Sequence, residues 1–106
     1  MAWIYLILAG LLEILWAFGM KASEGFTRPG WTVVTIIGMA ASVGLLALAM
    51  RSLPLGTAYA IWTGIGALGA FLVGIAVLGE AVTPLRIVSA TLILAGLVGL
   101  KLASGE

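Results

Sequence analysis

The stretch SLPLGTAYAIWTGIGALGAFLVGIAVLG, residues 52–79, contains no charged side chain and decides the fold of this 106-residue chain. An α-helix needs about 20 apolar residues to cross the ~30 Å hydrocarbon core of a membrane. Pro54 stands near the start of the stretch, where a helix tolerates the missing N–H. We therefore predict a transmembrane helix over residues 55–78.

Other parts of the chain have the same character. Residues 29–50 and 87–100 are uncharged, and between Met1 and Lys21 only Glu13 carries a charge. The last uncharged run is the shortest, so a basic residue beside it must extend to the membrane surface or face the protein interior. Four strands could not close a barrel, which leaves an all-α membrane protein as the fold class. The predicted transmembrane helices are 2–20, 31–50, 55–78 and 85–103.

Composition excludes several classes of function. Hydrophobic residues make up 63% of the chain and charged residues only 8%, against roughly 25% charged in a soluble domain. A soluble enzyme is therefore excluded, and a net charge of +1 offers no basic face for nucleic acid. The absence of Cys, His and Asp excludes disulfides, thiolate or imidazole metal sites and Ser-His-Asp catalysis. We expect residues 1–106 to form one transmembrane domain without enzyme activity, cofactor or metal.

The charges at the ends of the predicted helices bear on orientation. Short connections make neighbouring helices antiparallel, so four helices place both termini on one side of the membrane. That side carries Arg51 and Lys101, and the other carries Lys21, Arg28 and Arg86. This near balance gives almost no positive-inside bias. We expect the chain to insert both ways and form an antiparallel homodimer; a single topology set by one or two charges is the alternative.

Glu13 lies deep in the first predicted helix. At 1.5 Å per residue it is about 16 Å from a helix start at Ala2, close to the middle of the membrane. An ionisable residue at that depth indicates a functional site, and a protonated glutamate that only joins two helices is the alternative. Trp16 and Gly10 share its helical face. Gly10 leaves room for close packing or a cavity, and the Trp16 indole needs an acceptor, either Glu13 or a group that Glu13 orients.

Three more side chains share this depth. Ser42 is near the middle of the second predicted helix, and Tyr59 and Trp62 are three residues apart in the third. Each alone is compatible with a satisfied core residue, which is the preferred interpretation for Ser42 by itself. Together with Glu13 and Trp16 they predict a cation-binding site, because a carboxylate accepts paired N–H donors and aromatic rings attract cations.

Glycines in the third predicted helix have two interpretations. Gly64 and Gly66 lower helix stiffness, so they could form a kink that lets the helix adopt two shapes. Close packing against another helix is the alternative, and it is equally well supported because glycine is common in membrane helices.

The fourth predicted helix lacks polar chemistry but has a pattern of its own. Ser89, Ile93 and Gly96 lie along one helical stripe, which predicts a helix–helix contact in a dimer. Lys101 follows near the end of this helix. It either extends to the membrane surface or pairs with a carboxylate of a partner chain.

Three motifs resemble those of the small multidrug resistance family, over essentially the whole chain. They are LLEILWA (11–17), KASEGFTR (21–28) and PLGTAYAIWTGIG (54–66), of which the last is long and specific. Trp16, Met39, Ser42 and GIGALGA (64–70) are similar to the guanidinium-exporter subgroup. Drug-exporting relatives usually have a small residue in place of Trp16 and a tyrosine in place of Met39. Lys101 also matches a lysine of the subgroup, which favours a charge role for it.

The resemblance implies a transporter domain in the inner or plasma membrane, assembled as an antiparallel, dual-topology homodimer. It implies export of guanidinium ion, and of small substituted guanidines, in exchange for protons. Glu13 of both subunits would bind cation and proton in competition, with Gly10 and Met39 packed around the site. The implied lining residues are Trp16, Ser42, Tyr59 and Trp62.

Two other functions remain open from the sequence. A quaternary-ammonium multidrug exporter of the same family is the nearer alternative, although Trp16 and Met39 argue against it. A non-transporting partner subunit, or a small membrane adaptor whose glutamate only joins helices, belongs to a different class. A complete set of site residues in one chain argues against that second alternative.

Overall fold

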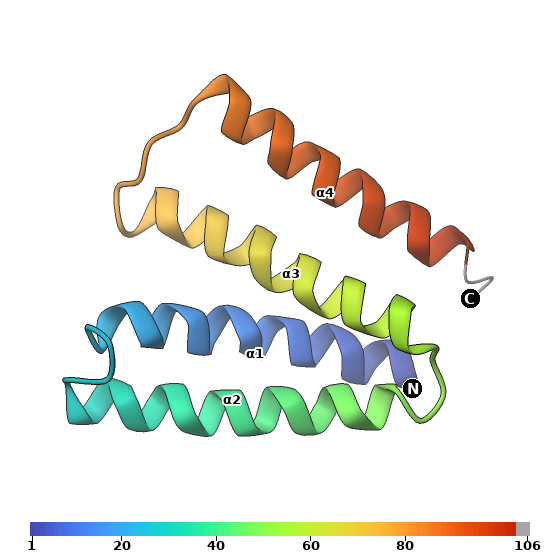
Figure 1. Cartoon of the computed structure of the whole chain (residues 1–106), viewed down its shortest axis with the longest axis horizontal. Helices are drawn as coiled ribbons and strands as arrows, with labels where there is room; N and C mark the ends of the chain where they lie inside the picture. Colours follow the sequence, from blue (N-terminus) through green and yellow to red (C-terminus); the bar gives the residue numbers. More distant parts are fainter. Residues whose placement is uncertain (104–106) are drawn as a thin grey trace.

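The computed structural model describes residues 1–103, which form four helices joined by short connections (Figure 1). Within this range, each helix is long and apolar enough to cross a membrane. The predicted all-α class with four membrane-spanning helices is confirmed. The helices are α1 (Ala2–Ala22), α2 (Pro29–Ala49), α3 (Leu55–Ala76) and α4 (Pro84–Ala103).

The helix boundaries differ from the predicted ones by a few residues. α2 begins at Pro29 rather than at residue 31, because a proline in the first turn of a helix loses no hydrogen bond. α3 ends at Ala76 rather than at residue 78, and Gly79 then turns the chain with a φ of +69°. α1 continues to Ala22, past the predicted end at residue 20.

α1 lies between α2 and α3 and contacts both along its length (Figure 1). In the described chain α2 contacts α3 only slightly, and α4 packs along α3 alone, apart from a contact of Lys101 with Trp3 of α1. The molecule is flat, with extents of 42 × 35 × 16 Å. α4 contributes no buried residue within the range that the structure describes. One copy therefore leaves broad apolar faces open.

The core lies where α1 begins, α2 ends and α3 begins. Its small alanines let the helix axes approach closely, which is how membrane helices pack when lipid and side chains are equally apolar. This core fixes α1, α2 and α3, the three helices that carry the predicted site, relative to one another. Its members are Leu6, Ala9, Leu46, Ala49, Leu53, Ala58 and Ile61.

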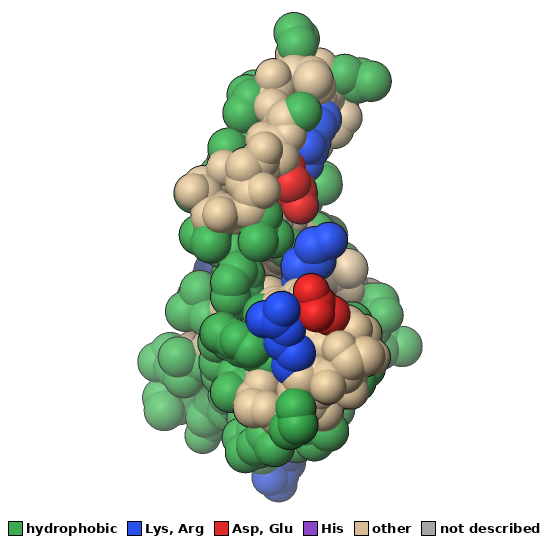
Figure 2. All heavy atoms as spheres, turned by 90° about the vertical axis from the view of Figure 1, so that its left-hand side faces the viewer, with side chains coloured by type: hydrophobic (Ala, Val, Ile, Leu, Met, Phe, Trp, Pro, Cys, Tyr) green, Lys and Arg blue, Asp and Glu red, His purple; other side chains and the backbone are tan. Residues whose placement is uncertain are grey.

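Charged side chains gather at the end of the molecule where α1 and α3 finish (Figure 2). Arg28 pairs with Glu24 over 3.1 Å, and Arg86 pairs with Glu80 over 3.3 Å. The rest of the surface in the same view consists of hydrophobic side chains and of backbone with uncharged polar side chains. This end therefore lies at a membrane surface, and Lys21 belongs to it as the last charged residue of α1.

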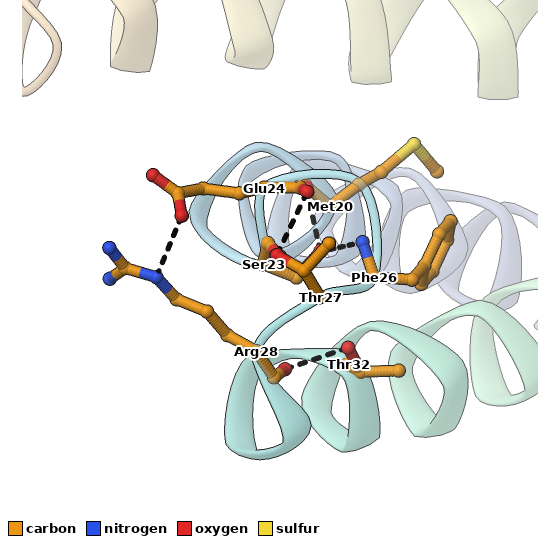
Figure 3. Close-up of polar contacts among 7 residues, drawn as sticks. All are labelled: Met20, Ser23, Glu24, Phe26, Thr27, Arg28 and Thr32. Atoms are coloured by element: carbon orange, nitrogen blue, oxygen red, sulfur yellow. Dashed lines mark hydrogen bonds and ion pairs between the residues drawn. The ribbon is translucent and has the colours of Figure 1, made fainter.

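The connection between α1 and α2 is held by Ser23, which is fully buried (Figure 3). Its hydroxyl donates to the Met20 carbonyl over 2.8 Å and accepts the Phe26 N–H over 3.0 Å. The Thr27 hydroxyl donates to the Ser23 carbonyl over 3.0 Å. These bonds hold residues 24–26 at positive φ, a conformation that costs free energy for the two that are not glycine. The KASEGFTR motif therefore encodes a tight turn.

Candidate functional site

The carboxylate of Glu13 lies against the backbone of α3. A Cβ atom placed on buried Gly66 would overlap Glu13 Oε1 and would lie 2.7 Å from Glu13 Cγ. Only a residue without a side chain admits the carboxylate here. Oε1 is itself buried and has no hydrogen-bond partner within residues 1–103. It is therefore able to accept a donor from a bound cation or to hold a proton.

Trp16 turns toward α2 instead. A Cβ placed on Gly38 would lie 3.2 Å from Trp16 Cβ, and the buried Trp16 Nε1 has no acceptor in the described chain. The prediction that the Trp16 indole N–H donates a hydrogen bond to Glu13 is thus wrong for this conformation. Residues three apart on a helix point about 60° apart. Because α1 lies between two helices, that angle sends Glu13 to α3 and Trp16 to α2.

Ser42 joins three helices through its buried hydroxyl. Ser42 Oγ donates to the Ala9 carbonyl over 2.6 Å and accepts the Trp62 Nε1–H over 3.0 Å. In an α-helix the Ala9 carbonyl also accepts the N–H of Glu13. Ser42 is a satisfied core hydroxyl, and it also connects the Trp62 indole to the turn of α1 that carries Glu13.

Tyr59 lies beside Trp62 on α3. Their ring centroids are 5.6 Å apart with an interplanar angle of 52°, and Tyr59 is 53% exposed. The structure therefore brings Ser42, Tyr59 and Trp62 into one group. Gly66, which receives the Glu13 carboxylate, is one turn, or about 6 Å, further along α3 than Trp62.

The two residues predicted to pack around the site lie on different helices. Gly10 of α1 is buried, and a Cβ there would lie 2.7 Å from Ile65 Cγ2 of α3. Gly10 thus permits close helix packing, one of its two interpretations. Met39 is half-buried on α2, next to Gly38 against which Trp16 packs.

α3 runs unbroken through its glycines from Leu55 to Ala76. Gly64 receives Leu97 of α4, and Gly66 receives Glu13 of α1. Both glycines serve close packing in this conformation, and a kink at them stays a prediction. Reasoning from the sequence missed Gly38 entirely and the true role of Gly66, because a glycine carries no local signal of which helix it faces.

The predicted contact residues of α4 are all exposed. Ser89 and Ile93 line the groove between α3 and α4, and Gly96 lies further along it. No part of the described chain lies within 4 Å of a Cβ placed on Gly96. At the end of α4, Lys101 Nζ lies 4.5 Å from the ring centroid of Trp3, a cation–π contact with the first turn of α1.

A sequence profile described as "Small Multidrug Resistance protein" matches residues 1–93. The chain belongs to this family. The small multidrug resistance match includes α1, α2, α3 and the first half of α4. It confirms the resemblance drawn from the three sequence motifs, and together with the four apolar helices it makes the chain a multi-pass membrane protein.

Similar members of the small multidrug resistance family are named "Guanidinium exporter". The one from Yersinia pseudotuberculosis serotype I (strain IP32953) is 61% identical over 104 residues, covering 98% of this chain and 100% of the relative. The one from Escherichia coli (strain K12) is 54% identical over 104 residues, covering 98% and 99%. A third, from Salmonella typhimurium, is also 54% identical over 104 residues, with the same 98% and 99% coverage.

Proposed function

We propose that this chain is a proton-coupled antiporter that exports guanidinium ion and small substituted guanidines. The observation that carries the proposal is the Glu13 carboxylate, whose Oε1 is buried against Gly66 without a hydrogen-bond partner in residues 1–103. Relatives named guanidinium exporters, 54% and 61% identical over nearly the full length, support it. The protein acts as a transporter and not as an enzyme.

The chemistry of the group fits a planar cation with N–H donors. A carboxylate accepts two parallel N–H bonds from a guanidinium, and the faces of Tyr59 and Trp62 attract its charge. Trp62 is fixed by its bond to Ser42, so its ring is held in one orientation. A quaternary ammonium ion has no N–H to offer, and a site built for hydrogen bonds discriminates strongly against an analogue that lacks them.

Coupling follows from competition for one group. A proton and a guanidinium ion each neutralise Glu13, and the presence of one excludes the other. An unpaired carboxylate is costly to move through an apolar environment, whereas a neutralised one is not. The outward step with guanidinium is therefore linked to an inward step with protons, and no covalent chemistry is needed.

A second copy of the chain completes the transporter. One copy is 16 Å thick in its shortest direction, and its α4 buries no described residue, so it encloses little volume for an ion. An antiparallel partner would supply the inverted repeat that many transporters carry within one chain. We place Ser89, Ile93 and Gly96 at that contact. Glu13 of each subunit would then face one shared site.

Alternating access needs an element with two shapes. We assign this role to α3, in which Gly64 and Gly66 lie opposite Leu97 and Glu13. A bend at these glycines would move the Glu13 contact and the α4 contact together. In an antiparallel dimer, the inward-open and outward-open states could be one structure with the two subunits exchanging roles.

The test is guanidinium-driven proton movement in liposomes that hold only this purified chain. Wild type and Glu13→Gln are compared, with tetraethylammonium as a second substrate. Proton flux with guanidinium that vanishes in the variant is the expected result. Flux with tetraethylammonium instead would make the chain a multidrug exporter, and no flux with either ion would favour a partner subunit or adaptor.

A further inference from the structure

We propose that Glu80 is a second guanidinium-binding carboxylate, placed at the membrane surface on the path to Glu13. The proposal rests on the proposed function, because it assigns a further binding position to the same ion. A cavity of about 140 Å³ lies between the ends of α1 and α3. Its lining is Ala17, Phe18, Lys21, Ala70, Val73, Leu78 and Glu80.

The cavity begins one helical turn beyond Glu13. Ala17 is four residues after Glu13 on α1, and Ala70 is four residues after Gly66 on α3. Each step is about 6 Å along its helix. Gly66 is the residue that receives the Glu13 carboxylate. Between Glu13 and the cavity, Ile14 of α1 packs on Gly69 of α3. A cation that passes from Glu13 toward this end of the molecule therefore has to separate this contact, and it then enters the cavity beside Glu80.

Two glycines place the Glu80 carboxylate in this position. Gly79 has a φ of +69° and turns the chain back, and the Glu80 N–H donates to the Gly74 carbonyl over 3.0 Å. A Cβ placed on Gly74 would overlap Glu80 Oε1 and lie 2.8 Å from its Cδ. The carboxylate thus lies against the backbone of α3 at Gly74, while 44% of the Glu80 side chain stays exposed and open to an ion from solution.

The present partner of Glu80 is itself a guanidinium group. Arg86 Nη2 makes a single contact of 3.3 Å with Glu80 Oε1. Arg86 is also held by Nη1, which donates to the Ala81 carbonyl over 2.7 Å, and by the Phe71 ring, 5.0 Å from its guanidinium carbon. Arg86 therefore stays anchored if it loses Glu80. A free guanidinium ion offers two parallel N–H donors and can replace the one long contact.

The charges around the cavity suit transient binding. Lys21 lines the same cavity as Glu80, and Arg86 contacts the Glu80 carboxylate directly. Two positively charged side chains therefore lie near Glu80. Their repulsion weakens the hold of Glu80 on a guanidinium ion, which a position along a transport path requires. The role of Glu80 is to raise the local concentration of the ion near the path, an effect on the apparent KM and not on the maximal rate.

The experiment measures the initial rate of guanidinium-driven proton flux against guanidinium concentration in liposomes. Glu80→Gln is compared with Glu24→Gln, which removes the other carboxylate at this end of the molecule. Glu24 is a matched control because it also pairs with an arginine, Arg28, over 3.1 Å, but it does not line the cavity. We expect Glu80→Gln to raise KM about 5- to 10-fold with the maximal rate within about twofold, and Glu24→Gln to change neither by more than about twofold.

A third variant gives a change of opposite sign. Arg86→Gln releases Glu80 from its present partner, so KM falls about 2- to 5-fold, a gain that misfolding cannot produce. Equal effects of Glu80→Gln and Glu24→Gln, or no fall in KM for Arg86→Gln, would overturn the proposal. These outcomes are distinct from failure of the proposed function, in which wild type itself gives no guanidinium-driven flux or Glu13→Gln leaves the flux intact.

Discussion

Trp62 Nε1 donates a hydrogen bond to Ser42 Oγ over 3.0 Å, and the same oxygen donates to the Ala9 carbonyl over 2.6 Å. One hydroxyl thus joins α3 to α2 and α1. The bond fixes the ring of Trp62 and supports the turn of α1 that carries Glu13. Movement of α3 against the other two helices has to break this bond or carry Ser42 with it.

Replacing Ser42 with alanine leaves the Trp62 N–H without its acceptor. An unpaired buried donor costs about 1–3 kcal/mol in water-soluble proteins, and interhelical hydrogen bonds in membranes average about 0.6 kcal/mol. We expect the variant to fold, to lose about 1 kcal/mol of stability, and to bind guanidinium about 3- to 10-fold more weakly with broader selectivity. Calorimetric titration with guanidinium and tetraethylammonium measures both effects.

A matched control for this change is Ser52→Ala, since Ser52 is an exposed serine in the turn between α2 and α3. It should leave stability and affinity unchanged. Full guanidinium affinity and selectivity in Ser42→Ala would show that the hydroxyl serves packing alone.

Adding one methyl group at Gly66 should displace the Glu13 carboxylate. A Cβ there overlaps Glu13 Oε1, so Gly66→Ala forces the carboxylate out of its place against α3. We expect guanidinium affinity to fall at least about tenfold, equivalent to about 1.4 kcal/mol. The control is Gly44→Ala on α2, where a Cβ meets no atom within 4 Å in residues 1–103. Affinity in Gly66→Ala that matches Gly44→Ala would contradict the assigned position of the carboxylate.

Helix number and class were predictable because they depend on the chain alone. Uncharged runs long enough to cross a membrane mark the helices, and prolines mark their starts. The boundaries were less certain: Pro29 begins α2 at the proline itself, and Gly79 sets the turn that follows the end of α3 at Ala76. Both positions depend on local backbone conformation, which charge and hydropathy do not report.

The chemistry of the site was predictable from residue types, but the directions of the side chains were not. Glu13 and Trp16 share a face of α1 by spacing, and the structure sends them to different neighbours because α1 lies between α2 and α3. The order of helices in the layer decides which glycine receives which side chain. The pairing of Glu13 with Gly66 depends on that order, so spacing within one helix could not give it.

The pH dependence of guanidinium binding follows from competition for Glu13. The protonated carboxyl does not bind the cation, so the apparent Kd rises as pH falls, by up to about tenfold per pH unit for each proton displaced. Calorimetric titration at a series of pH values measures this slope, because proton binding and cation binding to one group are linked. Glu24→Gln should keep the slope. A Kd independent of pH in wild type would exclude shared binding of cation and proton by one group.

The face of α4 gives the last prediction. In residues 1–103 a Cβ on Gly96 meets no atom within 4 Å, so the side chain of Gly96→Leu starts in open space within one copy. If the stripe of Ser89, Ile93 and Gly96 contacts a second copy, the added side chain separates the two. We expect dimers to dissociate at a protein density about tenfold higher than in wild type, a loss of about 1.4 kcal/mol.

Single-molecule photobleaching in liposomes of graded protein density measures the dimer fraction. Ala95→Leu is the matched control, because it adds similar bulk to an exposed neighbouring position that points about 100° away on the helix. Equal dimer fractions for Gly96→Leu and Ala95→Leu would remove this stripe from the interface. A selective loss with Gly96→Leu, together with a parallel loss of guanidinium-driven proton flux, would mean that the second copy is needed for transport.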